Sequence, residues 1–222
     1  MEILLAGVVG STAYGLAHEG SDVDVLGMFA APTEEFHGLR QPRESVVTTS
    51  PDRTLHEAGK AVRLMLSSNP TASELLWLER YDVRSPLGDG LIALRGSLLS
   101  APGVRSAYLG YASQQFRKLL TRDPGHRTRA AKHARHLVRL LRQAEELHST
   151  GRLTIRLPDP ERVRALGEWI AEEPERARPL LARAEAALDA PGALPDAPDE
   201  AAAEDWLRQV RRAFYGSNTP AR

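Results

Sequence analysis

The strongest constraint on the fold comes from one stretch near the start of the chain. An apolar run over residues 3–9 leads into Gly10 and Ser11, and a second apolar run over residues 22–29 carries two aspartates at alternate positions. Glycine lets a backbone approach an anion closely, and the free amides and hydroxyls of Ser11 and Thr12 at a helix start can hold phosphate oxygens. The order therefore predicts a strand, a phosphate-binding loop and a second strand that bears acidic side chains.

The two aspartates are Asp22 and Asp24. On a strand they project from one face, roughly 7 Å apart at their Cα atoms, while Val23 and Val25 face the core. Their hard oxygens suit Mg²⁺ or Mn²⁺, and two metal ions held there can activate an attacking oxygen and stabilise a leaving pyrophosphate. A Gly-Ser pair alone is common in turns, and an Asp-x-Asp alone is common at solvated strand edges. Together, in this order and between apolar runs, they predict a metal and phosphate site.

This stretch resembles the DNA polymerase β-type nucleotidyltransferase superfamily, whose signature is Gly-Ser followed downstream by Asp-x-Asp. The sequence over residues 10–17 and 20–27 is most similar to a branch of predicted nucleotidyltransferases that has been associated with RNA repair. The resemblance continues through Asn69-Pro70-Thr71 to Glu74-Leu75-Leu76-Trp77, Gly110-Tyr111, Lys132-His133 and Arg139-Leu140-Leu141. It implies a fold, a divalent metal, a nucleoside triphosphate (NTP) as substrate, and transfer of a nucleoside monophosphate to a hydroxyl acceptor that it does not identify.

The same resemblance leads us to expect a third active-site carboxylate, for which three acidic residues compete. Asp52 lies at the end of a predicted third strand that starts with the β-branched run 45–50, where the superfamily places this carboxylate. An ordinary turn is the alternative use of Asp52. Glu57 is the second candidate, although the first turn of a helix also favours an acid. Glu74 fits better in a capping box that begins at Thr71. The expected catalytic and metal-binding set is therefore Asp22, Asp24 and Asp52.

The composition excludes several other kinds of site. The 222 residues include 29 Lys and Arg and 29 Asp and Glu, so no global field recruits nucleic acid and a polyanion must meet a local patch. There is no cysteine, which excludes disulfides, thiolate zinc sites and cysteine catalysis. Neither a basic leader nor a run of about 18 apolar residues is present, so we expect a cytoplasmic protein without membrane spans.

The pattern of the chain predicts an α+β fold in two parts. Residues 1–100 alternate short apolar runs with helical patterns, which predicts a catalytic domain with a small mixed sheet flanked by helices. Residues 101–222 are nearly all helical in pattern, with a surface linker rich in Pro, Ala and Asp near residues 189–203. The apolar stripe that follows predicts a terminal helix docked on the body. Its members are Trp206, Val210 and Phe214.

The predicted helix over residues 127–148 carries an apolar and a basic stripe. The apolar stripe, expected to be buried, consists of Ala130, Ala134, Leu137, Leu141 and Ala144. The basic stripe consists of Arg129, Lys132, Arg135, His136 and Arg139. A solvated face is the ordinary explanation, but a triphosphate needs cations opposite the metal carboxylates, and the resemblance places a Lys-His…His…Arg pattern here. We therefore expect Lys132 and Arg139 to bind phosphate or RNA backbone, Arg139 by bidentate contact, and His136 either to hydrogen-bond a phosphate or to pack against the next helix.

The leading interpretation is a Mg²⁺-dependent nucleotidyltransferase whose NTP is bound at Gly10, Ser11 and Thr12, with an RNA end as one candidate acceptor. A phosphodiesterase could use the same two metals, although the phosphate loop argues against it. A nucleotide- or RNA-binding relative that has lost turnover would keep the fold but lack a working third carboxylate. The sequence leaves the nucleotide, the acceptor and the oligomeric state open.

Overall fold

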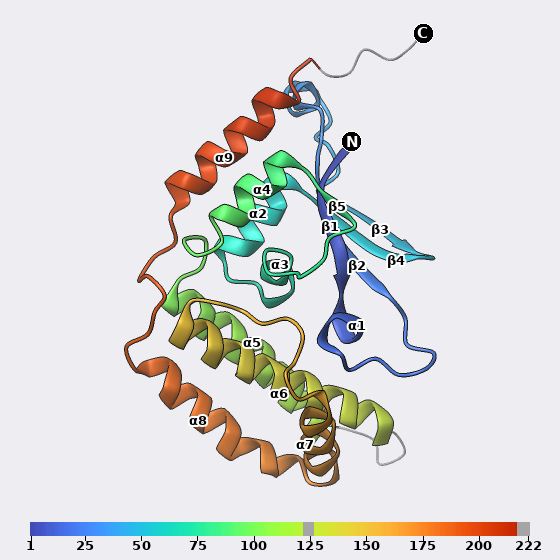
Figure 1. Cartoon of the computed structure of the whole chain (residues 1–222), viewed down its shortest axis with the longest axis vertical. Helices are drawn as coiled ribbons and strands as arrows, with labels where there is room; N and C mark the ends of the chain where they lie inside the picture. Colours follow the sequence, from blue (N-terminus) through green and yellow to red (C-terminus); the bar gives the residue numbers. More distant parts are fainter. Residues whose placement is uncertain (122–126, 217–222) are drawn as a thin grey trace.

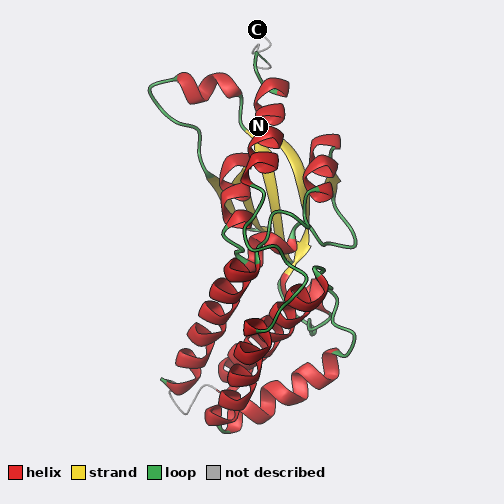
Figure 2. Cartoon of the chain, turned by 90° about the vertical axis from the view of Figure 1, so that its left-hand side faces the viewer, coloured by secondary structure: helices red, strands yellow, loops and turns green. Residues whose placement is uncertain are grey.

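The computed structural model describes residues 1–121 and 127–216; the remaining residues of the predicted helical domain, 122–126 and 217–222, lie outside this description. A five-stranded mixed sheet forms the N-terminal part of the chain, and long helices form the rest (Figure 1). Seen from the side, the sheet occupies the upper half of the molecule and the long helices the lower half (Figure 2). The predicted α+β class is confirmed.

The sheet has the spatial order β3-β4-β2-β1-β5. Its strands are β1 (Glu2–Val9), β2 (Asp24–Ala30), β3 (Ser45–Thr49), β4 (Asp52–Glu57) and β5 (Val83–Arg84). β1 pairs antiparallel with β2 and with β5, and β3 pairs antiparallel with β4. Only β2 and β4 pair in parallel among the described strands. Parallel pairing puts the first residues of β2 and β4 at the same edge of the sheet, and this edge becomes important below.

The second strand begins later than the sequence predicted. Val9 and Asp24 form the last pair of the β1–β2 ladder, because the chain turns out of β1 at Gly10. Asp22 therefore lies exposed in the loop before β2, and Val23 is 50% exposed instead of facing the core. The predicted alternation, with Asp22 and Asp24 on one strand face, is wrong for this reason.

Four helices belong to the N-terminal part. They are α1 (Gly10–Tyr14), α2 (Ala58–Leu66), α3 (Pro70–Glu74) and α4 (Pro86–Ala93), and a 3-10 turn covers Thr33–His37. Asn69 caps α3, since its Oδ1 accepts a hydrogen bond from Ala72 N at 3.0 Å, and Pro70 is the first helical residue. The predicted capping box from Thr71 to Glu74 is therefore wrong, and Glu74 is buried at the end of α3.

The helical part is built around one central helix. Its members are α5 (Ala101–Leu120), α6 (Arg127–Thr150), α7 (Pro160–Glu172) and α8 (Arg178–Asp189), with a 3-10 turn at Pro174–Ala177. α6 packs against α5, α7 and α8. The predicted apolar stripe is confirmed as the buried face of α6; Ala130, Ala134, Leu137, Leu141 and Ala144 are all buried.

The last described helix, α9 (Glu200–Ala213), returns to the sheet part and lies beside α2 and α4 (Figure 1). Trp206 and Val210 are buried there, and Trp206 Nε1 donates a hydrogen bond to Leu87 O at 2.8 Å. The terminal helix is thus docked on the sheet part. The helix starts inside the predicted 189–203 linker, because Asp199 caps it by accepting a hydrogen bond from Ala202 N.

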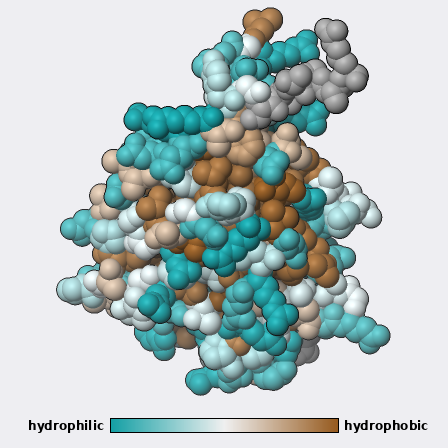
Figure 3. Space-filling model, turned by 45° about the horizontal axis from the view of Figure 1, so that its top comes forward, coloured by the Kyte–Doolittle hydropathy of each residue, from teal (hydrophilic) through white to brown (hydrophobic). Residues whose placement is uncertain are grey.

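The surface is mixed in character. On the face seen in Figure 3, hydrophilic side chains surround an irregular apolar band. Across the described ranges 1–121 and 127–216, no helix combines the length and the apolar character needed to cross a membrane.

Candidate active site

The parallel pairing of β2 with β4 brings two predicted carboxylates to one edge of the sheet. Asp24 is the first residue of β2 and Asp52 the first of β4, and the residues that follow them, Val25 and Arg53, are paired in register. The Asp24 and Asp52 carboxyl groups are within hydrogen-bonding reach of each other, and Asp22 adds a nearby negative charge. The edge therefore gathers acidic groups from both strands.

The pKa of Asp24 is shifted by the charges around it. Burial raises the pKa of Asp24, the negative charge of Asp52 raises it further, and Asp22 contributes a smaller effect in the same direction. The Lys132 ammonium acts on this pKa in the opposite direction. Like charges held together disfavour ionisation, so the acidic edge is a place where an added cation is stabilised.

The Gly-Ser loop lies directly against these carboxylates. Gly10 has a φ of +69°, a left-handed conformation that favours glycine, and a Cβ built on it would collide with Asp24 Oδ2. Ser11 and Thr12, the next residues of α1, are only partly buried. A side chain at position 10 would push the loop away from the acidic edge, so glycine is required for this close approach.

The oxygen donors at this edge are of the kind that binds a divalent metal such as Mg²⁺. No three Asp, Glu, His or Cys side chains of the described residues are grouped closely enough to hold an ion by themselves. Mg²⁺, however, is commonly bound by one or two carboxylates together with substrate phosphates. Asp24 and Asp52 supply hard oxygens whose mutual repulsion a cation relieves. The residues present therefore fit a divalent ion that arrives with a triphosphate, with Asp22 at the margin of the site.

The helical part presents cations near this acidic edge. Lys132 on α6 is exposed, and its charge acts on Asp24. Lys118 on α5 and Arg129 on α6 add positive charge around His133, lowering its pKa after the larger effect of burial. The sequence pattern did not single out Lys118, because Lys118 lies on a different helix from the basic stripe. Only the packing of α5 on α6 brings Lys118 close to His133.

His136 differs in charge from the lysines around it. Burial, followed by the charges of Arg139 and His133, lowers the pKa of His136 to about 3. Its imidazole is therefore neutral at neutral pH, and its one N–H can donate a hydrogen bond to a phosphate oxygen without contributing a positive charge.

Behind the Gly-Ser loop lies a buried polar network that joins α1, α3 and α6. Glu74 Oε2 accepts a hydrogen bond from the Tyr14 hydroxyl at 2.6 Å, and Glu74 Oε1 accepts from Arg139 Nη1 at 2.5 Å. Gln143 Nε2 donates to the same Oε1 at 3.1 Å, and the Arg139 guanidinium lies 4.2 Å from the centroid of the Tyr14 ring. Burial and the Glu74 charge raise the pKa of Tyr14 well above its usual value, so its hydroxyl stays protonated and donates.

This network corrects the expectation for Arg139. The Arg139 side chain is 6% exposed and its positive charge is paired with Glu74, so it is an interior cation and not a surface ligand for phosphate or RNA. The predicted basic stripe is also divided, because Arg135 pairs with Glu168 of α7 at 3.2 Å. Lys132 is the member of the predicted ligand set that remains exposed near the acidic edge.

Glu57 lies at the other end of β4 from Asp52. It caps α2 by accepting a hydrogen bond from Gly59 N at 2.7 Å, and both of its oxygens accept from Arg211 of α9, at 2.6 and 3.0 Å. With about 3.3 Å per strand residue, five residues separate it from Asp52 by roughly 16 Å. Of the three candidates for the third carboxylate, Asp52 is the one beside Asp24.

The arrangement defines a class of protein. A mixed sheet with a Gly-Ser loop after β1 and aspartates at one edge matches the signature of the polymerase β-type nucleotidyltransferases. Residues 1–189 match the family model of RlaP, the RNA repair pathway DNA polymerase beta family, and the chain belongs to this family. A search of curated proteins found no match. Family membership supports an enzyme of nucleotidyltransferase type.

Proposed function

We propose that the chain is a metal-dependent nucleotidyltransferase that moves a nucleoside monophosphate from an NTP to the hydroxyl of an RNA end. The observation that carries the proposal is the close approach of Asp24, Asp52 and Gly10 at one edge of the sheet, in a member of this family. The acidic pair and the Lys132 ammonium, whose charge acts on Asp24, match the two requirements of the substrate: a cation site and positive charge for phosphates.

In this proposal Asp24 and Asp52, with Asp22 at the margin, would hold the divalent metal, which would supply positive charge to neutralise the phosphates and to polarise the reacting oxygens. Gly10 lets the backbone approach the triphosphate, whose oxygens Ser11 and Thr12 bind through amides and hydroxyls. Lys132 binds a phosphate oxygen of the triphosphate. The neutral imidazole of His136 donates a hydrogen bond to a phosphate oxygen.

The chain's own part in the chemistry is to orient the acceptor and take its proton. The acceptor hydroxyl oxygen bonds to the α-phosphorus, the bond to pyrophosphate breaks, and the hydroxyl proton passes to an Asp52 carboxylate oxygen. The Tyr14–Glu74–Arg139 network supports this step indirectly, because it fixes α1 against α6.

The proposal is tested by incubating the protein with each α-labelled NTP, Mg²⁺ or Mn²⁺, and short RNAs that end in a 3′-hydroxyl or a 3′-phosphate. We expect label on the 3′-hydroxyl RNA alone, none with EDTA, and none with Asp24→Asn or Asp52→Asn. Glu57→Gln, a matched loss of one carboxylate at the far end of β4, should keep transfer wherever it stays folded. NTP binding without transfer to any acceptor would instead identify a non-catalytic relative.

A further inference from the structure

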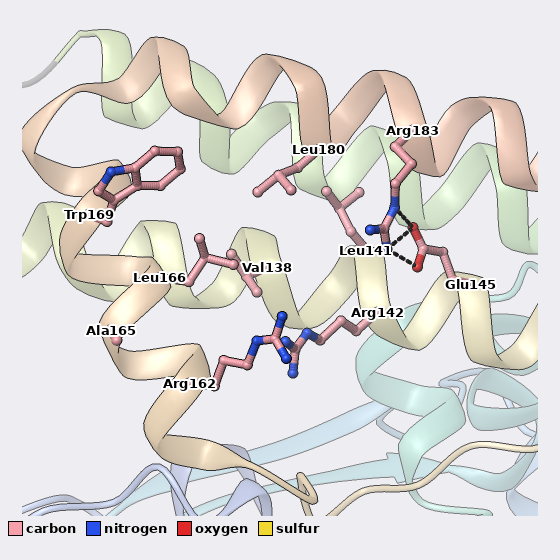
Figure 4. Close-up of a pocket in the computed structure, with 10 residues that line it drawn as sticks. All are labelled: Val138, Leu141, Arg142, Glu145, Arg162, Ala165, Leu166, Trp169, Leu180 and Arg183. Carbon is pink, nitrogen blue, oxygen red and sulfur yellow. Dashed lines mark hydrogen bonds and ion pairs between the residues drawn. The ribbon is translucent and has the colours of Figure 1, made fainter.

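A recess lies in the helical part, between α6, α7 and α8 (Figure 4). It is a cavity of about 460 Å³. Its floor is apolar and consists of Val138, Leu141, Leu166 and Leu180. Three arginines and one tryptophan stand around this floor: Arg142, Arg162, Arg183 and Trp169. We call this cavity the arginine groove.

Two of the three arginines of the arginine groove have no acidic partner among the described residues. Arg183 forms an ion pair with Glu145 at 2.9 Å. Glu145 is the acidic residue of the groove lining, so its charge is already balanced by Arg183. Arg142 and Arg162 point toward one another in Figure 4, and within the described ranges neither side chain has a hydrogen bond or an ion pair. Two neighbouring guanidinium groups without an acidic partner repel each other. An anion with several acceptor oxygens, such as a phosphate, would relieve this repulsion and accept hydrogen bonds from both groups.

Trp169 adds a second kind of contact. Its side chain is 45% exposed, and Figure 4 shows its ring at the opposite end of the groove from Arg142. The Arg176 guanidinium lies 4.8 Å from the ring centroid, so it occupies one ring face and holds the tryptophan in place. An exposed ring beside an apolar floor offers a planar base a stacking surface, and unpaired cations offer a phosphate a partner. This combination is typical of single-strand nucleic-acid sites.

Contacts of α7 and the course of α6 link the arginine groove to the acidic edge of the sheet. Arg164, two residues after Arg162 on α7, donates hydrogen bonds to Gly15 O at 2.8 Å and to Ala17 O at 3.4 Å. The first turns of α7 therefore rest on the loop that follows the Gly-Ser motif. On α6, Arg142 lies ten residues beyond Lys132, about 15 Å along the helix axis, a distance of a few nucleotides at about 3.4 Å each.

We propose that the arginine groove binds single-stranded RNA, with a phosphate between Arg142 and Arg162 and a base stacked on Trp169 above the apolar floor. The choice of RNA as occupant rests on the proposed function, in which an RNA end is the acceptor. The groove then holds the body of the strand whose end reaches the carboxylates, and it sets how tightly RNA binds.

The test measures RNA binding alone, by fluorescence anisotropy of a labelled single-stranded RNA of about ten nucleotides, in EDTA and without NTP. The double variant Arg142→Gln/Arg162→Gln should bind at least about tenfold more weakly, and the slope of log affinity against log salt should flatten by about 1.4, the value for two lost single-strand phosphate contacts. The control Arg208→Gln/Arg212→Gln removes two charges from α9 and should bind like the parent. Melting temperatures verify folding, which the loss of two repelling cations should leave intact.

The base contact has its own variant. Trp169→Leu keeps an apolar side chain without a stacking face and should weaken binding by roughly 5- to 150-fold, the range for a lost base-aromatic stack. Wild-type affinity and salt slope in the double variant, or no RNA binding by the parent at tens of micromolar, would overturn the proposal. Displacement of the RNA by an oligoglutamate peptide as effectively as by unlabelled RNA would also overturn it, in favour of an acidic protein partner. Because nothing here depends on transfer, failure of the groove and failure of the proposed reaction give separate results.

Discussion

Glu74→Gln tests the buried ion pair that joins the sheet part to the helical part. The substitution keeps the size of the side chain and removes its charge, so the Arg139 guanidinium loses its carboxylate while remaining buried. Removing one partner of a buried pair costs about 3–5 kcal/mol of unfolding free energy. The amide oxygen introduced by the substitution and that of Gln143 can still accept hydrogen bonds from Arg139, so we expect a loss near the lower limit, about 3 kcal/mol. A helix-capping role for Glu74 would instead predict a loss of about 0.5–2 kcal/mol.

Urea denaturation followed by circular dichroism gives the unfolding free energies. Glu185→Gln, which removes an exposed carboxylate paired with Arg105, is the matched control and should cost less than about 1 kcal/mol. The double variant Glu74→Gln/Arg139→Met should recover part of the loss, because no buried charge is left unpaired, with a coupling energy of about 0.5–3 kcal/mol. A loss below about 1 kcal/mol in Glu74→Gln, with additive effects in the double variant, would refute the argument.

Three further predictions concern the acidic edge and its surroundings. Gly10→Ala should abolish NTP binding and destabilise the fold more than Gly20→Ala, since both glycines have a positive φ but only the Gly10 Cβ would meet Asp24; titration and melting of both variants check this. Asp24→Asn should leave the melting temperature unchanged or raise it, because it removes the repulsion that raises the Asp24 pKa beside Asp52; a lower value would contradict this. The pKa of His136 is about 3 in the folded chain and 6.5 unfolded, so the unfolded state binds more protons between these values. Stability should be fully present above pH 6.5 and fall with pH below it, by up to about 1.4 kcal/mol per unit; an equal slope in His136→Gln would exclude this cause.

The local elements of this protein follow from its sequence. The apolar runs, the Gly10–Ser11 turn and the buried stripe of α6 are set by residues close together in the chain, so their periodicity predicts them. The stripe of Trp206 and Val210 likewise predicts a docked terminal helix. The sequence also singled out Asp24 and Asp52, although neither spacing nor composition shows that they meet.

The tertiary structure decided which charged residues are partners. Parallel pairing of β2 with β4 puts Asp52 beside Asp24 and places Glu57 at the far end of β4. The sequence alone left open which of these two acids lies beside Asp24. Packing of α3 against α6 converts Glu74 and Arg139, expected to be a cap and a phosphate ligand, into a buried ion pair. The role of a charged side chain depends on the groups that surround it. In a folded chain these groups come from positions that are distant in the sequence. Periodicity reports which face of an element is apolar, but it carries no information about which distant charge will lie opposite.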